Sequence, residues 1–109
     1  MKVVNGFNAE YQDEEITLED VERLEGDVLL EFGTPWCGYC KKAQPLLSEV
    51  MDDFLDVQHV KVVDGKGKRL GRHYQVKLWP TLIALQDGKE VGRVVRPDSE
   101  EEIRKLLDV

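Results

Sequence analysis

Short apolar runs and one long amphipathic stretch dominate the pattern of hydrophobic and polar positions. The apolar runs at 27–32, 57–63, 81–85 and 91–95 have the length of strands, and the first is typical of a central strand covered on both faces. The stretch 37–54 instead carries apolar residues at helical spacing, namely Ala43, Leu46, Leu47, Val50, Met51 and Phe54. The pattern therefore predicts a sheet with at least one long helix packed on it.

End signals mark further elements. Thr17 is placed to cap a helix whose first turn is acidic, and Gly26 fits its end. Asp87-Gly88 separates two apolar runs and predicts a tight hairpin. Ser99 begins a capping box that opens a C-terminal helix through Leu107. These signals therefore predict one helix in the N-terminal part of the chain and another at its C-terminal end, with a hairpin before the second helix.

The remaining segments complete the predicted order. Residues 68–74 form a short helix, Pro45 predicts a kink in the long helix, and Lys2–Val4 is a candidate edge strand. Residues 1–26 otherwise give no clean period and are the least defined part of the chain. Strands alternating with helices predict a layered α/β sandwich to which the hairpin adds antiparallel strands.

Composition narrows the class of protein. A chain of 109 residues with 41% hydrophobic and 34% charged side chains is expected to form one domain, 1–109. Its net charge of −7 disfavours nucleic-acid binding. We expect a cytoplasmic protein without a membrane segment, because no signal-peptide core follows Met1 and no apolar run approaches the ~18 residues that span a bilayer.

Charge is unevenly distributed between two segments. Residues 1–31 are strongly acidic, whereas residues 58–77 hold six basic residues and one acidic residue. Such runs are usually solvated faces, and the alternative is an electrostatic guide for a partner protein.

The two cysteines carry the candidate chemistry. They are too few for a disulfide scaffold or a four-cysteine zinc site, and the spacing of His59 and His73 fits no zinc motif, so no metal is expected. Cys37 and Cys40 stand at the start of a helix directly after the predicted central strand. Positions i and i+3 share a helix face, so the sulfurs can close a disulfide. Free N–H groups at the helix start stabilise a thiolate on Cys37, while Cys40, one turn inside, is suited to resolve a mixed disulfide.

These residues resemble the active site of the thioredoxin family. The stretch from Trp36 to Lys41 reads Trp-Cys-Gly-Tyr-Cys-Lys, which is similar to the family's Trp-Cys-Gly-Pro-Cys-Lys. Pro45 matches the proline of the family's active-site helix, and Trp79-Pro80-Thr81 looks like its X-Pro-Thr, whose proline is cis and faces the cysteines. The resemblance covers residues 27–108 and implies a three-layer α/β/α sandwich with a mixed central sheet.

The resemblance also implies roles for single residues. Glu31 stands where the family carries a buried aspartate, so a raised pKa and proton relay to Cys40 are expected; the alternative is a strand-end carboxylate that reaches water. If Trp79-Pro80 is cis, the backbone of Trp79 can pair with an extended substrate segment. The expected substrate-binding residues are Trp36, Gly38, Tyr39, Trp79, Pro80 and Thr81. Tyr39 replaces a proline and is expected to change the reduction potential.

The predicted function is reduction of protein disulfides by Cys37 and Cys40. The resemblance implies a monomer without a bound cofactor that is recycled by an NADPH-dependent thioredoxin reductase. Two alternatives stay open: a disulfide isomerase or oxidant in an oxidising compartment, and a thioredoxin-like binding module whose cysteines are idle. His59 and His73 are interpreted as structural or surface residues.

Overall fold

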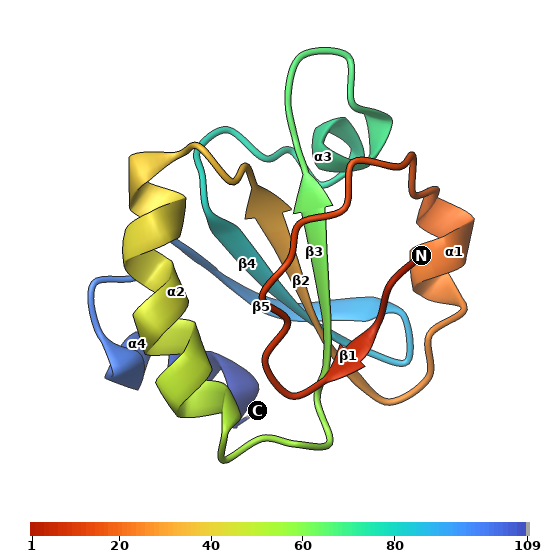
Figure 1. The fold of residues 1–109 in the computed structure, drawn as a ribbon. Helices are drawn as coiled ribbons and strands as arrows, with labels where there is room; N and C mark the ends of the chain where they lie inside the picture. Colours follow the sequence, from red (N-terminus) through yellow and green to blue (C-terminus); the bar gives the residue numbers. More distant parts are fainter. Residues whose placement is uncertain (109) are drawn as a thin grey trace.

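Residues 1–108 form five strands and four helices. A computed structural model describes residues 1–108 (Figure 1). The elements in chain order are β1 (Val4–Asn5), α1 (Leu18–Glu22), β2 (Asp27–Gly33), α2 (Gly38–Met51), β3 (Gln58–Val63), α3 (Arg69–His73), β4 (Thr81–Gln86), β5 (Lys89–Val95) and α4 (Glu100–Leu107). The predicted order of elements is confirmed, and α1 and α2 are shorter than the sequence pattern suggested.

The strands form one mixed sheet in the order β1-β3-β2-β4-β5. β2 pairs parallel with β3 and antiparallel with β4, while β1 and β5 run antiparallel to their neighbours at the two edges. All of β2 except Asp27 is buried. Its apolar run therefore fills the centre of the sheet, as predicted, and its carboxyl end leads directly to α2.

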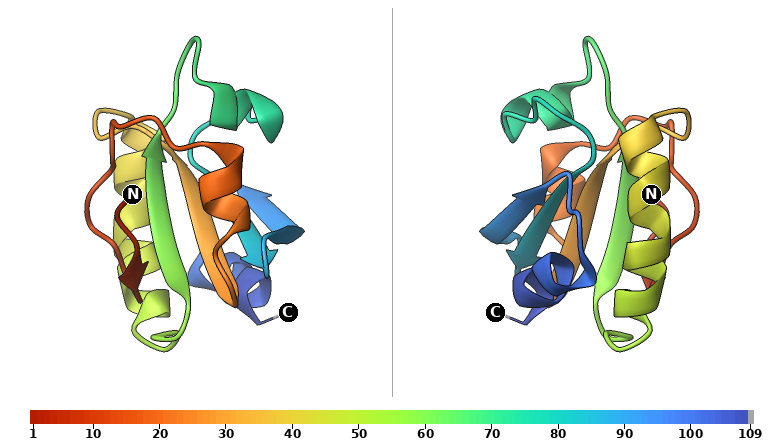
Figure 2. Two further views of the ribbon diagram at one scale, coloured as in Figure 1. Left: turned by 90° about the vertical axis from the view of Figure 1, so that its right-hand side faces the viewer. Right: turned by 90° about the vertical axis from the view of Figure 1, so that its left-hand side faces the viewer.

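Helices cover both faces of the sheet. Figure 2 shows α1 and α2 on opposite sides of the strands. α4 packs with α2, and α3 contributes to the same core as α1. The structure is thus the predicted three-layer α/β/α sandwich.

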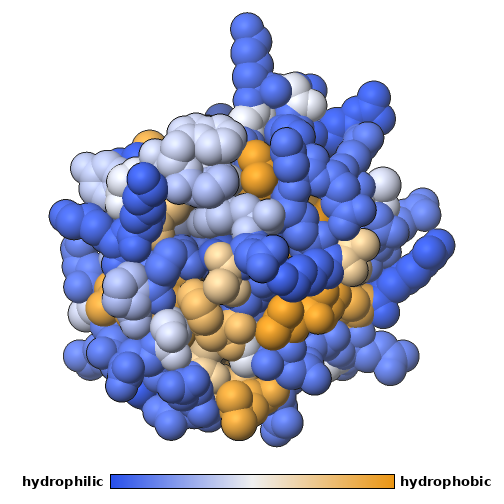
Figure 3. Space-filling model, viewed as in Figure 1, coloured by the Kyte–Doolittle hydropathy of each residue, from blue (hydrophilic) through white to orange (hydrophobic). Residues whose placement is uncertain are grey.

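The face shown in Figure 3 is largely hydrophilic, and apolar side chains lie between the polar ones, mainly in its lower half.

The basic segment 58–77 is not a continuous solvated face. His59 is fully buried and Lys61 is only 1% exposed, because both point from β3 into the protein. The other basic residues of this segment are exposed or half-buried, so the expected solvated face is present except at Lys61. Within residues 1–108 no helix is both long and apolar enough to cross a membrane.

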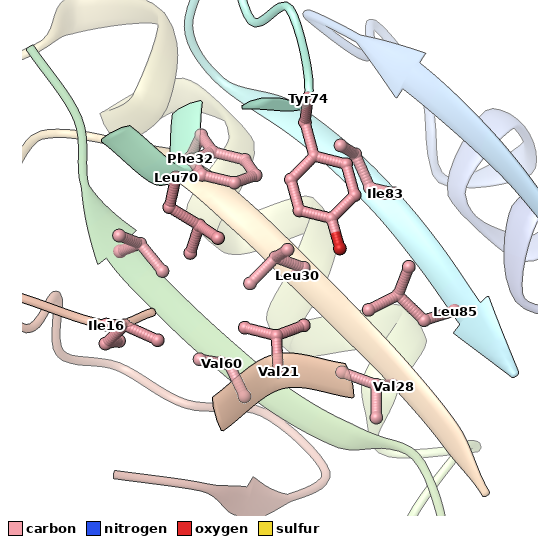
Figure 4. Packing of buried hydrophobic residues seen from close by; sticks show 11 residues of the cluster. Ile16, Val21, Val28, Leu30, Phe32, Val60, Leu70, Tyr74, Ile83 and Leu85 are labelled. Atoms are coloured by element: carbon pink, nitrogen blue, oxygen red, sulfur yellow. The ribbon is translucent and has the colours of Figure 1, made fainter. Parts of the chain in front are cut away.

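Two apolar clusters hold the layers together. Residues of β2 alternate between them, with Val28, Leu30 and Phe32 facing α1 and α3, and Leu29 facing α2 and α4. Figure 4 shows the first cluster, in which Tyr74 and Leu70 pack on the strand residues. This alternation places the side chain of Glu31 on the α2 face.

Caps and turns follow the sequence signals. Thr17 and Ser99 both form complete capping boxes at the starts of α1 and α4. Asp87 and Gly88 turn the β4–β5 hairpin with φ of 49° and 83°. Added to Gly88, a Cβ would lie 2.6 Å from the Glu22 carbonyl oxygen, so the hairpin packs closely on the end of α1.

The N-terminal segment follows the edge of the sheet next to β3. The edge strand is Val4–Asn5, shifted from the predicted Lys2–Val4, and it pairs with His59 and Gln58. Gln12 forms a further bridge with Val62. The segment that had no clean period is thus held by β3, and it passes beside the cysteine pair.

Candidate active site

Cys37 caps the N-terminus of α2. Its backbone is extended, and its Sγ accepts a hydrogen bond from the Cys40 N–H at 3.2 Å. A backbone donor at the positive end of a helix stabilises negative charge on sulfur. Cys37 is half-buried and unpaired, so its thiol is reachable from solvent. The sequence placed this residue correctly.

Cys40 lies one turn inside α2 and is buried. Burial raises the pKa of the Cys40 thiol to about 12, and the hydrogen bond with Cys37 adds to the rise. A cavity of about 360 Å³ reaches this thiol from the side of the N-terminal segment, and Tyr11, Gln44 and Lys61 also line it. The shielded position expected of a resolving cysteine is therefore present.

The loop before β4 faces Cys37. The Trp79–Pro80 peptide bond is cis, as expected, and the Trp79 carbonyl oxygen lies 4.0 Å from Cys37 Sγ. The Trp79 indole donates to Asp64 Oδ2 at 3.0 Å, and Thr81 Oγ1 donates to the Leu78 carbonyl at 2.6 Å. These bonds hold the loop beside Cys37 Sγ.

Glu31 is fully buried beneath the cysteine pair and accepts three hydrogen bonds. The Tyr11 hydroxyl donates to Oε2, Gln44 Nε2 donates to Oε2 at 3.0 Å, and His59 Nε2 lies 2.8 Å from Oε1. The alternative of a carboxylate reaching water was wrong, because β2 is covered by α2 at this position.

The expected raised pKa of Glu31 was also wrong. Burial is the largest single influence and raises the pKa, but His59, Lys61 and Tyr11 together outweigh it, and the pKa lies below its ordinary value. Hydrogen bonds to the charged form favour that form. Glu31 is therefore a buried carboxylate, not a neutral acid.

Tyr11 lies between Glu31 and Cys40. Its hydroxyl donates to Glu31 Oε2, and the hydroxyl oxygen is at most about 5 Å from Cys40 Sγ. Burial, followed by the charge of Glu31, raises the pKa of Tyr11, so the phenol keeps its proton. Gly33 makes room for this junction, because a Cβ there would lie 2.6 Å from both Cys40 Sγ and Tyr11 Oη.

His59 is fixed in one tautomer. Its Nδ1 accepts the Asn8 backbone N–H at 2.9 Å, so Nε2 carries the proton and donates to Glu31. His59 is thus a buried structural residue, as interpreted, but the sequence did not reveal that its hydrogen-bond partner is Glu31. β2 pairs with β3 so that Leu29 lies beside His59. Glu31 follows Leu29 by two residues, so the side chains of Glu31 and His59 lie on the same face of the sheet.

Lys61 stands next to Glu31 on the neighbouring strand and donates to Gln44 Oε1 at 2.6 Å. Its ammonium lies 4.3 Å from the centre of the Tyr11 ring. Burial lowers the pKa of Lys61, and the charge of Glu31 opposes this. Sequence reasoning missed Tyr11, Gln44 and Lys61, and the only available signal was a lysine inside an apolar strand.

Aromatic residues border the site on its outer side. Trp36 is 71% exposed and Tyr39 is 55% exposed. Gly38 begins α2 and has open space around the position of a Cβ. Together with Trp79, these residues surround Cys37 with an accessible rim. The arrangement therefore combines an accessible thiol, a shielded thiol and a buried carboxylate network.

Comparisons with known proteins agree with this arrangement. The family model described as thioredoxin matches residues 8–109. Thioredoxin from Chlamydia trachomatis is 37% identical over 82 residues, which are 75% of this chain and 80% of that protein. Thioredoxin from Bacillus subtilis is 34% identical over 88 residues, which cover 80% of this chain and 85% of that protein.

Two further relatives show the range of similarity. The structure of reduced thioredoxin 2 from Pseudomonas aeruginosa has a TM-score of 0.81 and 52% identity, covering 91% of this chain and 92% of that chain. Thioredoxin H2-1 of rice is 35% identical over 74 residues, or 68% of this chain, and the match spans about half of that longer protein, 54%.

Proposed function

This chain belongs to the thioredoxin family, which supports a thiol–disulfide oxidoreductase function, and we propose that Cys37 and Cys40 reduce disulfide bonds of proteins. The observation that carries the proposal is the contrast between the two thiols. Cys37 is accessible and receives a backbone hydrogen bond, whereas Cys40 is buried with its pKa raised to about 12. One thiol is suited to attack and the other to resolve.

The proposed reaction has two exchange steps. The Cys37 thiolate attacks one sulfur of the substrate disulfide, forming a mixed disulfide and releasing the other sulfur as a thiolate that takes up a proton. The Cys40 sulfur then attacks Cys37 Sγ, and the second substrate sulfur leaves as a thiolate, which is also protonated. The substrate gains two electrons and two protons, and the protein is left with a Cys37–Cys40 disulfide.

The second step requires a proton acceptor, because a thiol with a pKa of about 12 is rarely ionised at neutral pH. Tyr11 and Glu31 are placed for this role. The Tyr11 hydroxyl donates to Glu31 and has a lone pair for the Cys40 proton. In the proposed relay, Tyr11 accepts the proton of Cys40 as it passes its own to Glu31.

The wider setting is proposed from the family and the sequence. The oxidised protein would be returned to the dithiol by an NADPH-dependent thioredoxin reductase. The acidic net charge of −7 and the two-cysteine composition favour a monomer acting in the cytoplasm. Trp36, Gly38, Tyr39, Trp79, Pro80 and Thr81 are proposed to contact the substrate around Cys37.

Reduction of insulin tests the proposed function. With dithiothreitol as electron donor, the protein is expected to accelerate precipitation of the insulin B chain well above dithiothreitol alone. Replacement of dithiothreitol by NADPH and a thioredoxin reductase tests the recycling partner separately. No acceleration with either donor would contradict the reductase function, and acceleration with dithiothreitol alone would contradict only the partner.

Substitution Tyr11→Phe tests the relay. The ring and its contact with Lys61 are kept, while the hydroxyl between Cys40 and Glu31 is removed. Resolution of the mixed disulfide at pH 7 is expected to slow by about tenfold or more, and to regain speed as pH rises because hydroxide replaces the relay. Stopped-flow measurement separates this step from the attack of Cys37, which should change less than about twofold. A resolving step with unchanged rate and pH profile would contradict the relay.

A further inference from the structure

Arg96 is held rigidly beside Cys37, and the proposed reaction does not use it. Its backbone is left-handed, with φ of 50°, a conformation uncommon for a residue with a long side chain. Its Nε donates to the Trp79 carbonyl at 2.9 Å, and its guanidinium carbon lies 3.9 Å from the centre of the Tyr39 ring. A hydrogen bond and a cation–π stack thus fix both the position and the plane of the guanidinium.

The guanidinium is close to the attacking sulfur. Nε and Cys37 Sγ lie 2.9 and 4.0 Å from the same Trp79 oxygen, so they are at most about 7 Å apart. Consecutive Cα atoms of a peptide are about 3.8 Å apart. A side chain next to a substrate cysteine that is bonded to Cys37 can therefore reach Arg96.

The outer edge of this guanidinium is available to a ligand. Among residues 1–108, Arg96 forms no ion pair, and neither do Arg69 and Arg72, whereas Arg23, Arg93 and Arg104 each pair with a carboxylate. Its bond to Trp79 uses Nε, which leaves the two terminal nitrogens for a bidentate acceptor. A planar fork already fixed in place loses little side-chain freedom when it binds a carboxylate.

A groove continues from Arg96 along α2. It has a volume of about 310 Å³ and is lined by Tyr39, Lys42, Leu46, Arg96, Pro97 and Asp98. Its charged residues are two basic side chains and one acidic side chain, so the groove is basic on a protein whose net charge is −7. Local charge here is therefore opposite to that of the whole protein.

We propose that Arg96, stacked on Tyr39, recognises a substrate carboxylate next to the cysteine that Cys37 attacks. The preferred substrates are then disulfide proteins with Asp or Glu flanking that cysteine. This inference rests on the proposed reductase function and adds a substrate class to it. It also gives a reason for Tyr39 in the motif, since its ring supports the guanidinium.

The test compares two peptides with one intramolecular disulfide each, identical except for Glu or Gln beside both cysteines. The protein is first reduced with dithiothreitol and freed of it, and a single turnover is followed by acid quench and chromatography. Wild type is expected to reduce the Glu peptide about 5–10 times faster, as charge-assisted hydrogen bonds predict. The net negative charge of the protein would by itself give the opposite preference.

Variants identify the source of this preference. Arg96→Gln is expected to lower the ratio of the two rates below about twofold, and Arg96→Lys, which keeps charge without the fork, to give an intermediate ratio. The matched control is Arg23→Gln, which removes the same charge from the exposed C-cap of α1 and should keep the wild-type ratio. Circular dichroism and urea unfolding establish that each variant is folded.

The outcomes separate this inference from the reductase function. Equal reduction of both peptides by wild type, or a preference unchanged in Arg96→Gln, overturns the role of Arg96 and leaves the function standing. An equal loss of rate on both peptides in Arg96→Gln also overturns it, because Arg96 would then only position Trp79. Failure to reduce either peptide overturns the reductase function, and the inference with it.

Discussion

Substitution Cys37→Ser is expected to lower the rate of disulfide reduction by a factor of at least about 10³, because the attacking sulfur is lost. The fold should be preserved. Serine is a favourable N-cap residue, and its hydroxyl can accept the Cys40 N–H as the sulfur does. The measurement is the insulin assay with dithiothreitol, together with urea unfolding of the variant.

Cys40→Ser should behave differently from Cys37→Ser. Attack by Cys37 still occurs, but nothing resolves the product, so a mixed disulfide with the substrate accumulates. Mass spectrometry of the variant after exposure to a disulfide peptide is expected to find one peptide bonded to Cys37. The Cys37→Ser variant under the same conditions should carry none. Equal trapping by both variants would contradict the assignment of attacking and resolving roles.

Glu31→Gln is expected to lower the free energy of unfolding by about 2–4 kcal/mol at pH 7. The carboxylate accepts bonds from Tyr11, Gln44 and His59, whereas an amide presents two N–H groups to a site occupied by donors. At least one buried donor then has no acceptor. Urea unfolding at pH 7 measures the difference.

The effect of Glu31→Gln should decrease as pH falls. The folded protein lowers the pKa of Glu31, so the stability from the ionised carboxylate is fully present above the unfolded pKa of about 4.3. It is lost as pH falls through the still lower folded pKa. The difference between wild type and Glu31→Gln is therefore largest at neutral pH and smaller at pH 3.5.

Glu101→Gln is the matched control for these measurements. Glu101 is exposed on α4 and pairs with Lys105 across one helical turn, so its loss should cost less than about 0.5 kcal/mol. A Glu31→Gln difference that is equally large at pH 7 and pH 3.5 would contradict the ionised state of Glu31.

The activity of the site, the spacing of its two cysteines and the cis peptide bond beside them could be predicted from short stretches of the sequence. Cys37 and Cys40 are separated by three positions at a helix start, and this spacing alone places the two sulfurs together. The cis bond before Pro80 followed from the resemblance, because nearly all cis bonds precede proline. Glu31 was found as a carboxylate inside an apolar strand, but its expected pKa was wrong.

The direction of the Glu31 pKa change could not be predicted from the sequence. Burial of Glu31 follows from its apolar neighbours, but the sign of the pKa change depends on which donors reach the carboxylate. Tyr11 comes from a segment without periodicity, and His59 lies on a strand paired through long-range contacts. The pairing register of the sheet brings these residues together, and no short-range pattern in the sequence specifies that register.

The amino-acid sequence by itself determined the order of elements, the layered sandwich and the pairing of Cys37 with Cys40, because periodicity, capping and turn signals act over a few residues. The tertiary structure decided how that pair is supported. Packing of the N-terminal segment on β3 brings Tyr11 to Cys40, and the turn after β5 brings Arg96 onto Tyr39. These contacts join residues distant in the chain, so they exist only once the sheet has formed.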